Sequence, residues 1–400
     1  MINPVSWVDV DLDAIANNIK VIKKYIGNTR LLAVVKANAY GHGIVPVAMC
    51  AIESGADYLG VSSIEEGIFL RKNGINKPIL VFNTILPEQA HEVLLYDLTA
   101  TVCSFDVVQA LNDEATKLSK KATVHVKIDT GLGRFGILPE HSVELVKILI
   151  NNFDNVYLEG IYTHFSSATN KNFTRKQFNI FNSIIEQLKD LGYNIPIKHA
   201  CNSTATLNYP DMHLDMVRIG NLLYDLCPCK DIKIKNPSRI YSKIVFLKNL
   251  PKGHYIGYGN RYKTRKPITA AIVPVGFHEG LEIYISQPNG IWDAFKRFIK
   301  QILISFGISS NSRKVKINGI SCNILGKISM QNCIVDVTSI KEEVFVGDVV
   351  ELNARKLNLP QSLTRVYHYR DKVFLDSKLV SDKIRENLYD VNQRGETSIG

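Results

Sequence analysis

Short apolar runs alternate with amphipathic segments over residues 31 to 220. Between the apolar runs, segments such as Asp106–Leu118, Ser142–Ile150 and Arg175–Leu191 repeat apolar positions at helical spacing. Eight strand–helix alternations with short connections predict an α/β fold, a parallel TIM-like (β/α)8 barrel. The eight expected strands are Leu31–Val35, Tyr58–Val61, Ile79–Phe82, Leu98–Val102, Thr123–Ile128, Leu158–Thr163, Ile197–Cys201 and Met216–Ile219.

After residue 236 the pattern changes to β-rich runs separated by turns, without long helices between them. This pattern predicts a C-terminal, mostly antiparallel β domain. A longer segment, Tyr284–Ser312, interrupts it and has a helical pattern at Trp292–Leu303. The expected strands of this domain are Ile240–Phe246, Ile268–Val275, Lys314–Ile320, Asn323–Leu325, Cys333–Val337 and Val349–Leu352.

These patterns divide the chain into three expected parts. Residues 1–236 form the barrel, residues 237–376 the β domain, and residues 377–400 a polar C-terminal extension with a surface helix. The first strand, at about residues 5–11, is expected to join the β domain rather than the barrel.

Composition narrows the possible classes of protein. The chain has 400 residues, of which 46% are hydrophobic and 22% charged, as in globular proteins. No apolar run reaches the roughly 18 residues of a membrane span, and the N-terminus lacks a signal-peptide pattern, so we expect a cytoplasmic protein. Seven scattered cysteines predict reduced thiols rather than disulfides or a metal site.

The formal net charge of +10 raises the question of a nucleic-acid partner. Lysines and arginines are, however, spread along the chain, and no DNA- or RNA-binding motif accompanies their local clusters. We therefore expect no nucleic-acid partner, and a basic surface that attracts anionic metabolites.

Lys36 ends the first apolar strand and is the first candidate for chemistry. In a (β/α)8 barrel the functional side chains lie at the C-terminal ends of the strands. Burial there lowers the pKa of a lysine and favours the neutral amine, which can form an imine. Taken alone, a lysine at a strand end is more often an ordinary surface residue. The glycines at 41 and 43 weaken that interpretation, because they let backbone approach a ligand closely.

The segment Val34–Gly43, with the sequence VVKANAYGHG, resembles the cofactor-lysine motif of the alanine racemase family almost letter for letter. Further similar blocks follow in that family's order over about residues 7 to 370. They are Trp7–Ile15, Lys127–Gly136, Gly160–Phe165, His199–Ser203, Met216–Gly220, Gly257–Gly259 and Gly326–Met330.

The resemblance implies a racemase that depends on pyridoxal 5'-phosphate and interconverts L- and D-alanine, supplying D-alanine for cell-wall peptidoglycan. Lys36 would hold the cofactor as a Schiff base and act as the base on one face of the substrate Cα. Tyr258 of the partner subunit would be the base on the opposite face, so the active protein would be a homodimer with shared sites. His164 and Arg218 would form a hydrogen-bonded line with that tyrosine. Arg218, which does not give up a proton, would face the pyridine nitrogen and keep it unprotonated.

The remaining implied roles concern the cofactor phosphate and the substrate. Arg134 would assist the cofactor ring hydroxyl and the substrate carboxylate, which the backbone amide of Met330 also contacts. Lys127 aligns with a lysine that some members carry as a carbamate, which would position Arg134. No metal is expected. The implied phosphate and cofactor contacts are Tyr40, Asn202, Ser203, Gly220, Asn221 and Tyr367.

Departures from the family's pattern leave the substrate open. Gln331 stands where an aspartate is usual, Phe277 where a tyrosine is common, and Asp225 where a glycine is usual. Residues 284–312 also form a longer segment than in the family, so serine or a larger amino acid stays possible.

Two alternatives lie outside racemisation. One is a decarboxylase of the same architecture, although the glycine-rich phosphate loop and the cysteine-acid motif of that family are absent. The other is a cofactor-binding protein without turnover, although single-barrel binders lack a domain carrying Tyr258. Individually the candidates also fit structural roles, such as a core histidine at His164 or a helix N-cap at Ser203.

Overall fold

The computed structural model describes residues 4–260, 262–281, 291–292, 295–296, 298–299, 313–352 and 361–375, and the short strand at 378–379. The chain forms two compact units, one of residues Leu12–Pro237 and one of Met1–Asp11 with Ser238–Gly400. The expected helix at Trp292–Leu303, the longer segment Tyr284–Ser312 and the extension 377–400 fall largely outside the described residues.

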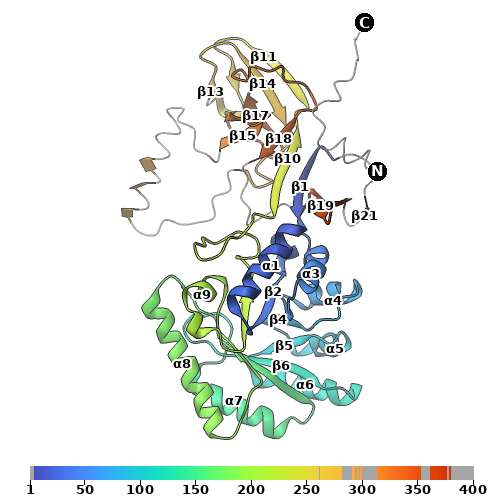
Figure 1. Cartoon of the computed structure of the whole chain (residues 1–400), viewed down its shortest axis with the longest axis vertical. Coiled ribbons are helices and arrows are strands. Elements are labelled where there is room, and N and C mark those ends of the chain that lie inside the picture. Colours follow the sequence, from blue (N-terminus) through green and yellow to red (C-terminus); the bar gives the residue numbers. More distant parts are fainter. Residues whose placement is uncertain are drawn as a thin grey trace. The chain divides into compact units, whose positions relative to one another are not determined.

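Residues Leu12–Pro237 form the expected parallel barrel, seen with its surrounding helices in Figure 1. Its eight strands follow the order β8-β7-β6-β5-β4-β3-β2-β9, and every neighbouring pair in this order is parallel. Between β8 and β9 the backbone N–H groups of Asp215 and Arg218 donate to Lys198 and Cys201 at 3.0 Å, which closes the barrel. The strands are β2 (Arg30–Val34), β3 (Tyr58–Val61), β4 (Ile79–Thr84), β5 (Thr99–Val102), β6 (Ala122–Lys127), β7 (Val156–Tyr162), β8 (Ile197–His199) and β9 (Met216–Ile219).

Helices follow the strands because their apolar positions repeat at helical spacing. In α8, for example, every third or fourth residue is buried, and Asn170 caps its first turn by accepting a hydrogen bond from Phe173 N at 3.1 Å. The helices are α1 (Leu12–Ile26), α2 (Lys36–Tyr40), α3 (Ile44–Glu53), α4 (Ile64–Lys72), α5 (Ala90–Leu95), α6 (Phe105–Leu118), α7 (Pro139–Asn152), α8 (Lys171–Asp190) and α9 (Ser203–Asn208), with 3-10 turns η1 (Pro87–Gln89) and η2 (Pro210–Met212).

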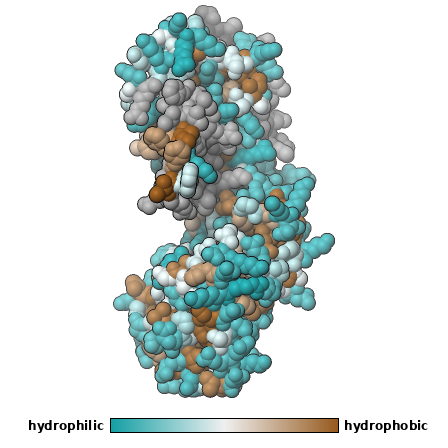
Figure 2. All heavy atoms as spheres, turned by 90° about the vertical axis from the view of Figure 1, so that its left-hand side faces the viewer, coloured by the Kyte–Doolittle hydropathy of each residue, from teal (hydrophilic) through white to brown (hydrophobic). Residues whose placement is uncertain are grey.

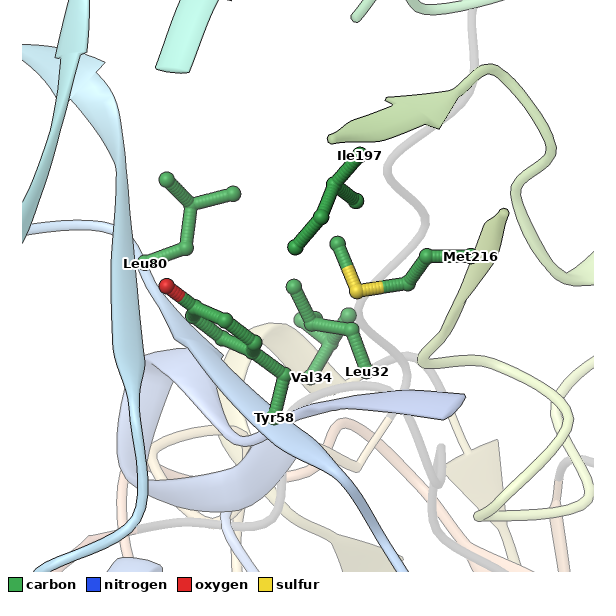
Figure 3. Packing of buried hydrophobic residues seen from close by; sticks show 6 residues of the cluster. All are labelled: Leu32, Val34, Tyr58, Leu80, Ile197 and Met216. Carbon is green, nitrogen blue, oxygen red and sulfur yellow. The ribbon is translucent and has the colours of Figure 1, made fainter. Parts of the chain in front are cut away.

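Much of the barrel core consists of packed apolar side chains. Strands β3, β5 and β9 are buried at every position, as expected for parallel strands covered on both faces. Part of this core is the cluster drawn in Figure 3. Its residues come from β2, β3 and β4 and from β8 and β9, the two ends of the strand order. Its members are Leu32, Val34, Tyr58, Leu80, Ile197 and Met216.

The second unit contains an 11-stranded, mostly antiparallel sheet. Strand β1 (Ser6–Asp11) lies in it, antiparallel to β10 and parallel to β19. The other elements are β10 (Ser238–Lys243), β11 (Phe246–Leu250), β12 (Tyr255–Ile256), the 3-10 turn η3 (Tyr258–Asn260), β13 (Tyr262–Lys263), β14 (Ile268–Val273), β15 (Lys314–Ile317), β16 (Ile320–Leu325), β17 (Cys333–Asp336), β18 (Val349–Leu352), β19 (Thr364–Tyr369), β20 (Lys372–Leu375) and β21 (Lys378–Leu379).

Two strand predictions in this sheet were wrong. The expected strand Ile240–Phe246 is divided between two strands, β10 and β11. The first pairs with β1 and β18, whereas the second pairs with β14. The expected strand Lys314–Ile320 ends at Ile317, because Asn318 and Gly319 have φ values of 51° and 77°. Positive φ at both central residues is the requirement of a type I′ hairpin turn, so Ile320 already belongs to the next strand.

Figure 2 shows one face, on which hydrophilic side chains predominate and apolar side chains are scattered between them. Among the helices that the structure describes, none has both the length and the apolar content needed to span a membrane.

Candidate active site

Lys36 lies directly after β2, at the C-terminal end of a barrel strand. The four residues that follow, Ala37, Asn38, Ala39 and Tyr40, all have left-handed backbone conformations with φ between 52° and 56°. For residues other than glycine this conformation costs roughly 1 kcal/mol each. A run of four therefore persists only where the surrounding structure holds it.

Contacts from several elements hold this left-handed turn. The Glu66 carboxylate on α4 accepts hydrogen bonds from the backbone N–H of Ala37 at 2.5 Å and of Ser62 at 2.8 Å. The Asn38 side chain accepts from Ile44 N at 2.8 Å, at the start of α3. These contacts consequently fix the backbone between Lys36 and Tyr40, and with it the positions of both residues after β2.

Tyr40 and its neighbours form an aromatic group beside the turn. The Tyr40 ring lies 4.9 Å from that of Tyr224, and the Tyr224 hydroxyl donates to the backbone oxygen of Val34 at 3.0 Å. His42 stacks on the other side of Tyr224 at 4.7 Å. Burial raises the pKa of Tyr40 to about 12, so its hydroxyl remains a hydrogen-bond donor at neutral pH.

Four cations, on Lys36, Lys127, Arg134 and Arg218, influence one another at this end of the barrel. Burial lowers the pKa of Lys36, and the positive charge of Arg134 lowers it further. Burial also lowers the pKa of Lys127 to about 8, with further contributions from Arg218 and Arg134. The two lysines therefore carry the neutral amine more readily than an exposed lysine does.

Arg218 is buried in β9 and is held by neutral partners. Its Nη1 donates to His199 Nδ1 at 2.8 Å, and its Nη2 donates to the backbone oxygens of Thr163 at 2.7 Å and Ala200 at 3.0 Å. His164 Nδ1 lies 3.4 Å from the same Nη2. Burial, together with the four cations, holds the pKa of His164 well below its usual range, so this imidazole is neutral.

The loops after β8 and β9 approach each other at Ser203 and Gly220. The Ser203 hydroxyl accepts from the backbone N–H of Gly220 at 3.0 Å and of Leu222 at 3.2 Å. A Cβ atom on Gly220 would lie 2.6 Å from the Tyr40 hydroxyl oxygen. Only glycine therefore leaves room here, and a serine hydroxyl, a tyrosine hydroxyl and backbone N–H groups meet around a small space.

Asn202 and Asn221 flank this arrangement. Asn202 is the N-cap of α9, where its side chain accepts from Ala205 N at 3.0 Å, so the cap is this residue and not Ser203. The two loops follow the seventh and eighth strands of the barrel, the usual place for a phosphate in this fold.

The other candidates belong to the second unit. Tyr258 begins the short turn η3 between two glycines of positive φ, and its side chain is 70% exposed. Met330 is 57% exposed, and its backbone oxygen accepts from His278 N at 3.0 Å. Tyr367 is buried in β19, opposite Val10 of β1.

Three of the family departures, Asp225, Phe277 and Gln331, lie within the described residues, and Gln331 is exposed. Asp225, where a glycine is usual, has φ of 54°, which explains the preference for glycine. Phe277 is 43% exposed and donates its backbone N–H to Ser329 at 3.1 Å.

Sequence reasoning missed three polar residues that support this site. Glu66 braces the lysine turn, and His125 and Glu159 lie in a buried hydrogen-bonded chain that reaches Arg218 through His199. A signal for the last two was present, since each is an ionisable residue in the middle of a β-rich run, ATVHVK for His125 and VYLEGIY for Glu159.

Comparisons with known proteins agree over almost the whole chain. Residues 10–228 match the family model of the alanine racemase N-terminal domain, and residues 238–370 match that of the C-terminal domain. Alanine racemase 1 of Oceanobacillus iheyensis is 36% identical over 356 residues, covering 87% of this chain and 88% of the relative. Alanine racemase of Methanococcus maripaludis is 38% identical over 359 residues, covering 88% and 89%.

A solved structure gives the same result at the level of the fold. The alanine racemase of Clostridium difficile 630 superposes with a TM-score of 0.82 and 30% identity, covering 95% of this chain and 99% of that one. The matched families, the identities and the superposition lead to one conclusion: the chain belongs to the alanine racemase family.

Proposed function

We propose that this protein interconverts L- and D-alanine with pyridoxal 5'-phosphate bound at the C-terminal end of the barrel, and that the D-alanine serves cell-wall peptidoglycan. The observation that carries the proposal is a half-buried lysine with a lowered pKa, fixed by a left-handed turn beside three further cations. Family membership gives this arrangement its reaction. The named relatives are alanine racemases, and they do not favour a decarboxylase or a protein without turnover.

The charges of the site support an anionic cofactor and an anionic substrate group. The nearby carboxylates of Glu66 and Asp129 already accept hydrogen bonds from backbone amides, so they compensate the cations only in part. A phosphate and a substrate carboxylate would supply the missing negative charge. The Ser203 hydroxyl, which accepts from Gly220 N, and the Tyr40 hydroxyl beside Gly220 each carry a proton that could be donated to a phosphate.

Pyridoxal phosphate, when bound, makes the Cα proton of an amino acid acidic by withdrawing electrons from that carbon. Lys36 would anchor the cofactor and then accept or return the Cα proton at Nζ, which its lowered pKa permits at neutral pH. Tyr258 of the partner subunit would do the same at Oη on the opposite face. Inversion requires one proton carrier on each face, which is why both residues are needed.

Arg218 and His164 would set the electrostatics between these groups. The Arg218 guanidinium stays protonated even though burial lowers its pKa to about 10, so it offers a cofactor ring nitrogen only donors. His164 is neutral and can share hydrogen bonds without adding a charge. Arg134 and the Met330 amide would hold the substrate carboxylate. Asn202, Asn221 and Tyr367 would complete the contacts to the cofactor.

Replacement of Gly220 by alanine is expected to weaken pyridoxal phosphate binding by roughly 5- to 150-fold, because overpacking of roughly 1–3 kcal/mol falls on the Tyr40 hydroxyl. Fluorescence titration of the cofactor-free protein measures the affinity. The double variant with Tyr40→Phe removes the clashing oxygen, so it should bind no more weakly than Tyr40→Phe alone. Unchanged affinity in Gly220→Ala would contradict the assignment of this space to the phosphate.

Lys127 is expected to carry a carbamate. With a pKa of about 8, roughly one amine in ten is neutral at pH 7, against one in several thousand for an ordinary lysine. The neutral amine attacks dissolved CO2, forms an N–C bond and releases a proton, which leaves an anion beside Arg134. At fixed dissolved CO2 the modified fraction should rise from pH 6 to pH 8, because deprotonation of the amine precedes the reaction.

Carbon-13 NMR with labelled bicarbonate detects this carbamate. Lys127→Arg is the matched variant, since a guanidinium keeps its charge and does not react. A carbamate signal of equal size in the variant, or none in the unmodified protein across this pH range, would contradict the prediction.

The decisive test of the reaction is to incubate the purified, cofactor-loaded protein with single L-amino acids in deuterium oxide. We expect loss of the Cα proton and formation of the D-enantiomer with alanine, at a higher kcat/KM than with serine or larger amino acids. Faster turnover of another amino acid would contradict alanine as the substrate but would still support a racemase. No exchange with any amino acid would reject the proposed function.

A further inference from the structure

A chain of four hydrogen-bonded side chains crosses the interior of the barrel to Arg218. Glu159 Oε2 lies 3.1 Å from His125 Nε2, and His125 Nδ1 lies 2.9 Å from His199 Nε2. His199 Nδ1 then lies 2.8 Å from Arg218 Nη1. His125, His199 and Arg218 are at most 3% exposed, and the Glu159 side chain at the end of the chain is 23% exposed.

The two ends of the chain fix the direction of every hydrogen bond in it. An arginine only donates, and a carboxylate only accepts. His199 must therefore accept at Nδ1 and donate from Nε2, and His125 must do the same in turn. Burial lowers the pKa of both histidines, in agreement with two neutral imidazoles that each carry their proton on Nε2.

Among the residues that the structure describes, no carboxylate contacts the Arg218 guanidinium directly. Its recorded partners are His199, His164 and the backbone oxygens of Thr163 and Ala200, all of them neutral. A buried charge without compensation is strongly unfavourable. The chain through the two imidazoles ends on Glu159, which is the anion at its far end.

The backbone is shaped to place Glu159 and His125. Val124 pairs with Leu158 but His125 pairs with Gly160, so Glu159 is the extra residue of a bulge in β7. A bulge re-aims a side chain. A Cβ atom on Gly160 would lie 2.6 Å from the His125 ring, so the glycine makes the room that this imidazole occupies.

Further contacts hold the carboxylate at its end of the chain. The Tyr58 hydroxyl donates to Glu159 Oε2 at 2.7 Å and pairs with Thr99 Oγ1 at 2.6 Å. The Tyr58 ring itself packs in the apolar cluster of Figure 3. Despite partial burial, hydrogen bonds from His125 and Tyr58 hold the pKa of Glu159 below its usual value, so it remains an anion.

We propose that Glu159 is a positioning residue for the racemisation: through His125 and His199 it fixes the direction of the hydrogen bonds that orient the Arg218 guanidinium. The effect on turnover rests on the proposed function, whereas the hydrogen-bond direction does not. Glu159 touches neither substrate nor cofactor in this role.

Glu159→Gln tests the proposal because it keeps the shape of the side chain and removes the charge. An amide both donates and accepts, so the direction of the chain is no longer enforced. We expect kcat for alanine to fall about tenfold with KM within about twofold, since Arg218 acts on the reacting complex rather than on substrate capture. Glu140→Gln, the same change at an exposed position of α7, should leave both parameters unchanged.

Nitrogen-15 NMR of histidine-labelled holoenzyme gives a readout that a general loss of stability would not produce. In the unmodified protein both imidazoles should be neutral with the proton on Nε2, and in Glu159→Gln a second tautomer of His125 should appear. Unchanged tautomers, or an unchanged kcat, in Glu159→Gln would overturn the proposal.

If Glu159→Gln does not fold, the spectrum of the unmodified protein still tests the proposal. A proton on Nδ1 of His125 or His199, or a charged imidazole at either residue at pH 7, would also overturn it. Tyr58→Phe retains the carboxylate and should retain both Nε2 tautomers. An unmodified protein that fails to racemise any amino acid would reject the proposed function, while these spectra would still decide the direction of the chain.

Discussion

Lys36→Ala is expected to lower kcat for alanine racemisation by at least about 10³-fold, with the fold retained. In the proposed mechanism the variant would lose both the covalent anchor for the cofactor and the proton carrier on one face of the substrate. The fold should survive because burial and the charge of Arg134 both disfavour a cation at Lys36. Removal of the amine therefore relieves electrostatic repulsion in the folded protein. Proton NMR in deuterium oxide measures the loss of the Cα proton, and near-ultraviolet circular dichroism reports the tertiary structure.

Two controls separate the chemistry of Lys36 from its charge. Lys36→Arg keeps a cation but removes a group that can be neutral at pH 7, so it should be about as inactive as Lys36→Ala. Lys20→Ala makes the same substitution at an exposed position of α1 and should have normal activity. Exchange at the normal rate in Lys36→Ala would exclude this lysine as the cofactor anchor.

The barrel could be predicted from the sequence because its strands are buried on both faces. Tyr58–Val61 is apolar throughout and Met216–Ile219 is apolar except for Arg218, and the structure has both strands with the expected bounds, buried at every position. The second unit was harder, since its strands change partners within a few residues. Between β10 and β11 nothing in the local pattern marks the change, whereas the Asn318–Gly319 turn had a signal that the strand prediction ignored.

The candidate site also has features that could be predicted from the sequence and features that could not. The position of Lys36 follows from one strand and one motif, but its left-handed turn does not. Ala37 and Ala39 have no intrinsic preference for positive φ, and the brace on Ala37 comes from Glu66 on another element. The chain behind Arg218 also depends on a bulge in β7, which the order of residues in one strand does not reveal.

Tyr258→Phe should reduce racemisation at least about 10³-fold and yet leave exchange of the Cα proton of one enantiomer only. Lys36 would still remove and return the proton on its own face, so deuterium enters without inversion. Separate incubations with L- and D-alanine in deuterium oxide, followed by chiral chromatography, measure exchange and inversion independently. Loss of exchange with both enantiomers, or undiminished inversion, would contradict the role of Tyr258 as the second base.

Mixing Tyr258→Phe with Lys36→Ala tests whether the tyrosine comes from the partner subunit. Tyr258 is 70% exposed in the single chain, as a side chain that completes another subunit's site would be. A mixed dimer would then combine the intact Lys36 of one chain with the intact Tyr258 of the other in one of its two sites. Random reassortment makes about half of the dimers mixed, so about a quarter of the sites, and of the racemase activity, should return. If each chain used its own tyrosine, every site in the mixture would lack one base, and subunit exchange would restore nothing.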